Sequence, residues 1–327
     1  MQPFGAIRGA SGRLLQLFTL LLLTLQNTAL VLVTKFSYRE GTMPYAVSTV
    51  IMFSEAVKFV FSCFMVVVCD GHAALKEALR DTATSALRLS LPSVLYVIQN
   101  NLLFEGVRTL SPTAYTACSQ SKILTSAFFG VMLLKLRITR KQSVALCGLV
   151  IGMIMVQNGD RANVRKEYIR SDSPLYGVVV VFLASCTSGF AGTYLEKMYK
   201  EAHVGGIKPS IWFRNAQLSC FSLPIAGFTA YWRDSKTIFS EGVFAGYNGT
   251  VITIIALQAI GGLVVAAVMR YASNLLKCFA VSLSICICAV ATTCVFGDGQ
   301  LAIGAQQVVG VMLVICSTFV FMAKKTL

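Results

Sequence analysis

Charge is scarce in this sequence. Of its 327 residues, 13% are charged, against about 25% in a typical soluble domain, and 56% are hydrophobic. This composition excludes a disordered chain, a nucleic-acid-binding arm and almost any soluble enzyme. Apolar stretches of about 18 or more residues recur from end to end, which indicates a polytopic membrane protein.

Histidine is rarer still. His72 and His203 are the only two, and both lie in polar linkers, which excludes a His-based metal or catalytic site inside the membrane. The eleven cysteines fall in or beside apolar segments, as small hydrophobic residues do, and not in a disulfide framework. The sequence also lacks a P-loop, paired carboxylates and a nucleophile–His arrangement. We therefore expect no catalytic residue, no metal, no cofactor and no nucleic-acid partner.

The apolar segments predict an all-α fold of ten transmembrane helices, because backbone groups in hydrocarbon must be satisfied internally. These segments are 14–34, 45–69, 88–109, 112–134, 142–157, 174–198, 209–232, 247–270, 275–296 and 302–323. The polar loop 158–173 separates two five-helix repeats, residues 1–157 and residues 174–327. A repeat with an odd number of spans is inverted in its second copy, and inverted repeats are typical of transporters.

Two lysines stand in or near the predicted spans, at corresponding places in the two halves. Lys122 lies about ten residues from either end of its span, and Lys277 lies near the start of its own. An ionised group at mid-membrane costs about 2.5–3.5 kcal/mol. Lys277 could reach the interface, and either lysine could pair with a Glu of another helix. Two symmetric cations facing one cavity would instead suit a phosphate or pyrophosphate.

Polar side chains in two further places could bind a nucleoside. Tyr115, Ser119 and Lys122 are spaced i, i+4, i+7, on one face of a helix. The Tyr115 ring could stack on a base, or it could belong to the interfacial aromatic belt. Gln99 and Asn100 carry amides that both donate and accept, which suits either a base edge or hydrogen bonds between helices.

The remaining polar pairs follow helical spacing. Asn215 and Ser219 are i, i+4, a second polar stripe. Glu55 and Lys58 are i, i+3, which predicts an ion pair within one helix. That pair could be purely structural, or it could exchange partners during transport.

Small residues indicate where helices approach one another closely. Gly189 and Gly192 lie in one span and favour helix packing. Gly148 and Gly152 form a GxxxG motif, which suits either packing within the chain or a contact in a homodimer.

The stretches that carry these residues resemble the Golgi nucleotide-sugar transporters of the CMP-sialic acid/UDP-galactose/UDP-N-acetylglucosamine branch, in the drug/metabolite transporter superfamily. In chain order, these stretches are Gln99-Asn100-Asn101, Tyr115 to Ile123, Ser188 to Gly192 with Glu196-Lys197, Trp212 to Gln217, and Asn274 to Lys277. The resemblance covers nearly the whole chain.

The resemblance implies a non-enzymatic exchange of a cytosolic nucleotide-sugar for a nucleoside monophosphate. It also assigns roles to the polar residues. The phosphate groups would be bound by Lys122 and Lys277. The nucleoside would be bound by Tyr115, Asn100, Gln99, Asn215 and Ser219. The sugar side of the cavity, or the gate, would be formed by Glu55, Lys58 and Asn274.

Departures from the family pattern bear on the donor. Ser219 and Cys278 stand where the pattern has Tyr and Gly, which weakens the match to CMP-sialic acid carriers, and Ile123-Leu124-Thr125 looks more like UDP-sugar carriers. We predict an antiporter of a UDP-sugar, galactose or N-acetylhexosamine, for UMP. A CMP-sialic acid/CMP antiporter is the alternative within the class. A membrane-embedded glycosyltransferase is the alternative outside it, although Asp298 alone supplies no metal site.

The resemblance places the protein in the Golgi membrane. The segments on the side of the two termini carry more Lys and Arg than the opposite side, which favours cytosolic termini. Lys324 and Lys325 near the C-terminus form either a dilysine signal for retrieval to the endoplasmic reticulum or a basic flank of the last span.

Overall fold

A computed structural model describes residues 10–39, 45–71, 86–110, 115, 118–159, 174–200, 210–296 and 305–323. Within these ranges the chain forms eleven helices and no strands, which confirms the all-α class. They are α1 (Ala10–Arg39), α2 (Val47–Asp70), α4 (Ala86–Thr109), α6 (Ser121–Leu134), α7 (Arg140–Gly159), α8 (Pro174–Lys200), α9 (Ile211–Arg233), α10 (Ser235–Glu241), α11 (Gly249–Tyr271), α12 (Asn274–Phe296) and α13 (Ala305–Met322).

Every predicted span overlaps one of these helices. Before the start of α6 at Ser121, residues 115, 118 and 119 of the predicted 112–134 span are also helical, and residues 112–114, 116 and 117 lie outside the described set. The short helix α10 follows Asp234 and was not predicted, because its seven residues are too few and too polar to form an apolar run. The two histidines, most of the loop 158–173 and the C-terminal lysine pair lie outside the described residues.

Four of the described helices are long and apolar enough to cross a membrane. They are Gly12–Thr34 within α1, Val47–Asp70, Leu175–Lys200 within α8, and Gly249–Tyr271. Shorter apolar stretches occur in α6, α12 and α13. Large apolar side chains such as Leu14, Val144 and Phe319 are more than two-thirds exposed, as expected of surfaces that face lipid. The chain is therefore a membrane protein built from apolar helices.

Side chains at several helix starts supply hydrogen bonds that the first turn lacks. Thr139 and Gln142 form a capping box before α7: the Thr139 backbone N donates to Gln142 Oε1 at 3.0 Å, and the Gln142 backbone N donates to Thr139 Oγ1 at 3.3 Å. Ser210 accepts from Phe213 N at 3.1 Å at the start of α9. These caps set where the helices begin.

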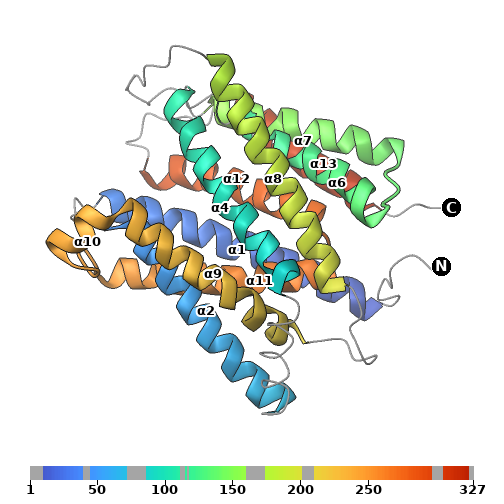
Figure 1. Cartoon of the computed structure of the whole chain (residues 1–327). Helices are drawn as coiled ribbons and strands as arrows, with labels where there is room; N and C mark the ends of the chain where they lie inside the picture. The colour runs from blue at the N-terminus through green and yellow to red at the C-terminus, as the bar shows by residue number, and fades with distance from the viewer. Residues whose placement is uncertain are drawn as a thin grey trace. The chain divides into compact units, whose positions relative to one another are not determined.

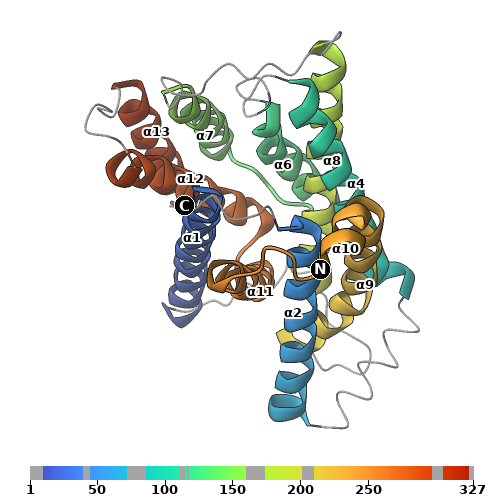
Figure 2. The same cartoon turned by 90° about the vertical axis from the view of Figure 1, so that its left-hand side faces the viewer.

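By internal packing the chain forms two units. Unit 1 comprises residues 1–94 and 198–273, and unit 2 comprises residues 95–197 and 274–327. In unit 1, α2 packs along α9 and α1 packs along α11 (Figures 1 and 2). In unit 2, α7 packs along α13 and α6 packs against α12. Each unit thus combines helices from both halves of the sequence.

The GxxxG motif of α7 packs within the chain. A Cβ built on Gly152 would lie 2.9 Å from the Gly310 carbonyl oxygen, and one built on Gly148 would lie 2.6 Å from Ser317 Oγ. Both contacts are made with α13, so the small residues allow the α7 and α13 backbones to approach closely. Of the two roles considered for this motif, the structure supports packing within the chain.

A basic side chain also closes a helix end in unit 1. The last turn of α11 leaves carbonyl groups without helical partners. Lys200, the final residue of α8, donates from Nζ to the Ala272 carbonyl oxygen at 2.7 Å. A cation at the C-terminal end of a helix is also favoured by the helix dipole.

Candidate functional site

Unit 2 brings together the two lysines predicted to bind phosphate. Lys122 is the second residue of α6, Lys277 is the fourth residue of α12, and these helices pack against each other. Both side chains are half-buried, and the two lysines are near enough for their charges to affect each other. Within the described part of the chain, neither lysine forms an ion pair with a carboxylate. An anion bound beside both ammonium groups would therefore be stabilised by two positive charges.

Helical backbone precedes Lys122, the second residue of α6. Cys118 and Ser119 are helical, and Gln120 has α-helical φ and ψ values of −68° and −17°. Residues 111–114, 116 and 117 lie outside the described set, so the depth of Lys122 within the 112–134 span stays a prediction. Lys277 lies in the first turn of α12, where free N–H groups and the positive end of the helix dipole add to the attraction for an anion.

Tyr115, Ser119 and Lys122 each have helical backbone, and residues 116 and 117 lie outside the described set, so the single face proposed for these three residues stays a prediction. Tyr115 precedes α6 and lies against α4: a Cβ built on Gly106 would be 3.4 Å from Tyr115 Cε2. Gln99, seven residues before Gly106 in α4, is half-buried, with a buried Oε1 atom. Asn100 lies in the same helix, and its side chain is outside the described set.

Asn274 begins α12, the helix that carries Lys277. Its backbone N donates to Glu196 Oε2 at 2.7 Å, and its Nδ2 donates to Thr193 Oγ1 at 3.4 Å. Glu196 is 1% exposed, so a buried carboxylate from α8 closes the positive end of α12. A Cβ on Gly192 would lie 2.4 Å from Asn274 Oδ1, so this glycine makes room for the asparagine.

A second glycine allows α8 to approach α6. A Cβ built on Gly189 would lie 2.7 Å from Thr125 Oγ1 and 2.8 Å from the Ser126 backbone N. Thr125 donates from Oγ1 to the Ser185 carbonyl at 2.7 Å and to the Lys122 carbonyl at 3.1 Å. The contact with α8 therefore reaches the turn of α6 that holds Lys122.

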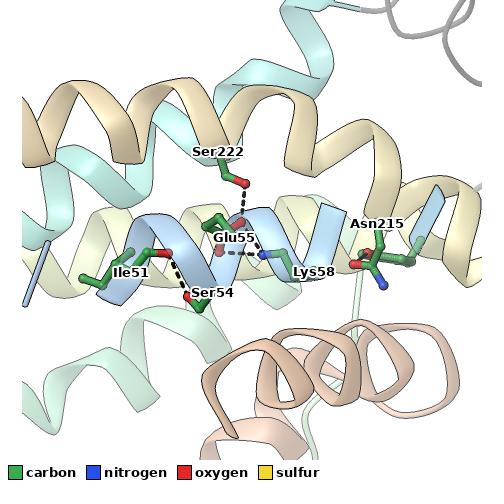
Figure 3. Close-up of polar contacts among 7 residues, drawn as sticks. Ile51, Ser54, Glu55, Lys58, Asn215 and Ser222 are labelled. Atoms are coloured by element: carbon green, nitrogen blue, oxygen red, sulfur yellow. Dashed lines mark hydrogen bonds and ion pairs between the residues drawn. The ribbon is translucent and has the colours of Figure 1, made fainter. Parts of the chain in front are cut away.

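In unit 1, the ion pair predicted from the i, i+3 spacing is present. Lys58 Nζ lies 2.5 Å from Glu55 Oε2 and 2.6 Å from Oε1, and Ser222 of α9 donates to Glu55 Oε2 (Figure 3). The aliphatic part of the Lys58 side chain packs against α11, because a Cβ built on Gly262 would lie 2.8 Å from Lys58 Cδ. The pair thus lies where α2 meets α9 and α11.

The pair can be tested with a double-mutant cycle. Glu55→Gln should lower the thermal stability of the purified protein, because it leaves the Lys58 charge without its partner, whereas Glu55→Gln combined with Lys58→Met should restore part of the loss. The side chains are 20% and 15% exposed, respectively, so we expect the single change to cost about 1–3 kcal/mol. Additive losses in the double variant would contradict coupling between the two residues.

Asn215 and Ser219 lie in α9 and are 4% and 0% exposed. Tyr199, near the end of α8, donates its hydroxyl to Asn215 Oδ1 at 2.9 Å. Figure 3 shows Asn215 at a different position along α9 from Ser222, the residue that contacts Glu55. The sequence motifs include Glu196, but sequence analysis gave no role to Glu196, Tyr199 or Ser222, because each acts through a tertiary contact that no local spacing predicts.

Four of the predicted site residues share one property. Each has a buried polar atom that makes no hydrogen bond with any residue the structure describes: Gln99 Oε1, Asn215 Nδ2, Ser219 Oγ and Asn274 Oδ1. More than about 90% of buried polar groups in proteins have a partner. Such atoms therefore favour a polar ligand or water at these places.

Apolar helices that hold two neighbouring lysines and several orphaned polar atoms are typical of a membrane transporter for anionic solutes. A family model described as "Nucleotide-sugar transporter" matches residues 11–322. The chain belongs to the nucleotide-sugar transporter family. This confirms the family that the sequence motifs resemble, and it makes the chain a transporter rather than an enzyme.

Individual relatives agree with this assignment. The UDP-N-acetylglucosamine/UDP-N-acetylgalactosamine transporter nstp-4 of Caenorhabditis elegans is 36% identical over 323 residues, covering 94% of this chain and 93% of the relative. The UDP-N-acetylglucosamine transporter of Homo sapiens is 33% identical, with 92% and 93% covered. The UDP-galactose translocator of Mus musculus is 32% identical, with 92% and 78% covered.

A solved structure is also similar in fold. It matches with a TM-score of 0.61 at 14% sequence identity and covers 96% of both chains. At this level of identity, the likeness concerns the fold alone.

Proposed function

We propose that the protein exchanges a UDP-sugar, either UDP-N-acetylhexosamine or UDP-galactose, for UMP across the Golgi membrane. The observation that carries this proposal is the pair Lys122 and Lys277, which lie on two packed helices without a carboxylate partner among the described residues. The named substrates of the three relatives support the choice of UDP-sugars.

The residues divide by the part of the substrate that they would bind. Lys122 and Lys277 bind phosphate oxygens. The nucleoside is bound by Gln99, Asn100, Tyr115, Asn215 and Ser219. The ion pair of Glu55 and Lys58, together with Asn274, lies toward the sugar or takes part in gating.

Obligate exchange follows from the charge of the lysine pair. Two ammonium groups without carboxylate partners are costly to move through the membrane interior when no anion is bound. The diphosphate of a UDP-sugar and the phosphate of UMP each supply the missing negative charge. Either ligand would therefore lower the barrier to reorientation, and the empty carrier would reorient slowly.

The architecture we propose is ten transmembrane helices in two inverted five-helix repeats, residues 1–157 and 174–327, joined by the loop 158–173, with both termini in the cytosol. The overlap of all ten predicted spans with helices supports this arrangement. An odd number of spans per repeat requires that the second copy be inverted.

Nucleotide binding can be tested on the purified protein by thermal stabilisation with UMP, CMP, GMP and AMP. We expect UMP to raise the melting temperature, since a ligand at 100 times its dissociation constant adds about 2.7 kcal/mol of stability. Exchange is then measured in proteoliposomes preloaded with UMP or left empty, with labelled UDP-sugar outside. Uptake only into preloaded vesicles is the expected result. Stabilisation by GMP alone, or by no nucleotide, would contradict the proposal.

A further inference from the structure

The carboxylate of Glu196 lies at the start of α12, the helix that carries Lys277. Its Oε2 atom accepts from the Asn274 backbone N at 2.7 Å, and the Glu196 side chain is 1% exposed. A hydrogen bond to a charged acceptor is roughly twice as strong as one between neutral groups. Burial strengthens the bond further, because the local dielectric constant is low. The contact therefore ties the first backbone N–H group of α12 to α8.

A second contact between α8 and Asn274 supports the first. Asn274 Nδ2 donates to Thr193 Oγ1 at 3.4 Å, and both residues are buried, at 2% and 0% exposure. Gly192 leaves the space for the Asn274 side chain, since a Cβ built there would lie 2.4 Å from Asn274 Oδ1. Helix α8 thus holds Asn274 both by its backbone and by its side chain.

Lys277 belongs to the helical turn that these contacts hold. It lies three residues after Asn274, within one turn of the same helix. Among residues 274–280, all of which the structure describes, every residue except Lys277 is buried. The next residue, Cys278, lies 3.8 Å from Ser126 Oγ of α6. The direction in which the Lys277 side chain leaves this packed turn is therefore set by the position of the backbone.

We propose that Glu196 is a positioning residue for phosphate binding, which holds the first turn of α12 where Lys277 reaches the phosphate. This inference rests on the proposed function, in which Lys277 binds the phosphate of the nucleotide. Glu196 itself is buried within the protein and acts through the Asn274 backbone, not by contact with the substrate. Loss of the contact would let the turn shift and weaken the bond from Lys277 to phosphate. A ligand without phosphate would bind as before.

The test compares the affinities of UMP and uridine, which differ only by the phosphate, in the full-length purified protein. The wild type should bind UMP more tightly. In Glu196→Ala, the ratio of UMP to uridine affinity should fall about tenfold, which corresponds to the loss of one hydrogen bond to a charged group. The affinity for uridine should change little. Glu196→Gln keeps an oxygen that can accept from the Asn274 backbone N, and it should retain most of the ratio.

Lys200→Met is the matched control for loss of stability. Lys200 lies one turn after Glu196 on α8, but it donates to the Ala272 carbonyl at the end of α11 and so caps the other helix. This substitution should lower the melting temperature and leave the ratio of UMP to uridine affinity unchanged. A general loss of stability would then not account for the effect of Glu196→Ala.

Two further variants test whether Glu196 acts through Lys277. Glu196→Asp keeps the charge on a shorter side chain, so the contact with Asn274 lengthens and the ratio should again fall. In a Lys277→Ala background, Glu196→Ala should cause no further fall. An unchanged ratio in folded Glu196→Ala or Glu196→Asp protein, an equal loss of affinity for both ligands, or a further fall in the Lys277→Ala background would overturn this inference alone. A wild type that binds UMP no more tightly than uridine would instead contradict the proposed function.

Discussion

Lys277→Ala is expected to lower the rate of UDP-sugar/UMP exchange about a hundredfold in proteoliposomes. Each hydrogen bond to a charged group contributes about 1.5–3 kcal/mol, and Lys277 also lies in the first turn of α12, near Lys122. Removal of this ammonium weakens phosphate binding from both faces of the membrane. It therefore affects uptake and return, which an exchanger requires in every cycle.

The matched variants separate charge from folding. Lys277→Arg keeps the charge and should retain part of the activity, although a guanidinium is larger and planar. Lys141→Ala removes an exposed lysine from the first turn of α7 and should leave exchange unchanged. Full exchange by Lys277→Ala, with UMP still raising the melting temperature, would refute the role of this lysine in phosphate binding.

Gly189→Ala is expected to destabilise the protein by about 1–3 kcal/mol, a cost typical of overpacking a close contact. The added methyl group would lie 2.8 Å from the Ser126 backbone N and from the Thr125 carbonyl carbon, so α6 or α8 must shift. Because Thr125 donates a hydrogen bond to the Lys122 carbonyl, the shift should move Lys122 and reduce the rate of UDP-sugar/UMP exchange. A lower melting temperature, together with weaker stabilisation by UMP, is the expected result.

Gly227→Ala serves as its control. A Cβ at this position in α9 meets only Met52 Sδ, at 3.9 Å, which is an ordinary contact. The substitution should be neutral or slightly stabilising, because Ala is the better helix former. Equal decreases in melting temperature in both variants would mean that glycine is required at these positions for a reason other than close helix packing.

The features that sequence predicted well depend on local spacing. The apolar runs overlap ten of the eleven helices in the described ranges, since hydrocarbon allows few backbone conformations other than a helix. The pair of Glu55 and Lys58 follows from two positions one turn apart. The shared role of Lys122 and Lys277, inferred from corresponding positions in the two halves, stays a prediction.

The features that sequence missed depend on contacts between distant segments. Glu196 lies 78 residues from Asn274, and its bond to the start of α12 requires α8 to pack there. Tyr199 reaches Asn215 across a helix–helix contact, with no motif to indicate it.

Charged side chains from the end of α8 bind one helix end in each unit. In unit 1, Lys200 donates to the Ala272 carbonyl at the end of α11, and in unit 2, Glu196 accepts from the Asn274 backbone N at the start of α12. Protein groups thus satisfy backbone atoms that a helix end normally leaves to water. These backbone atoms need no water molecule, a condition that hydrocarbon imposes on every polar group of the backbone.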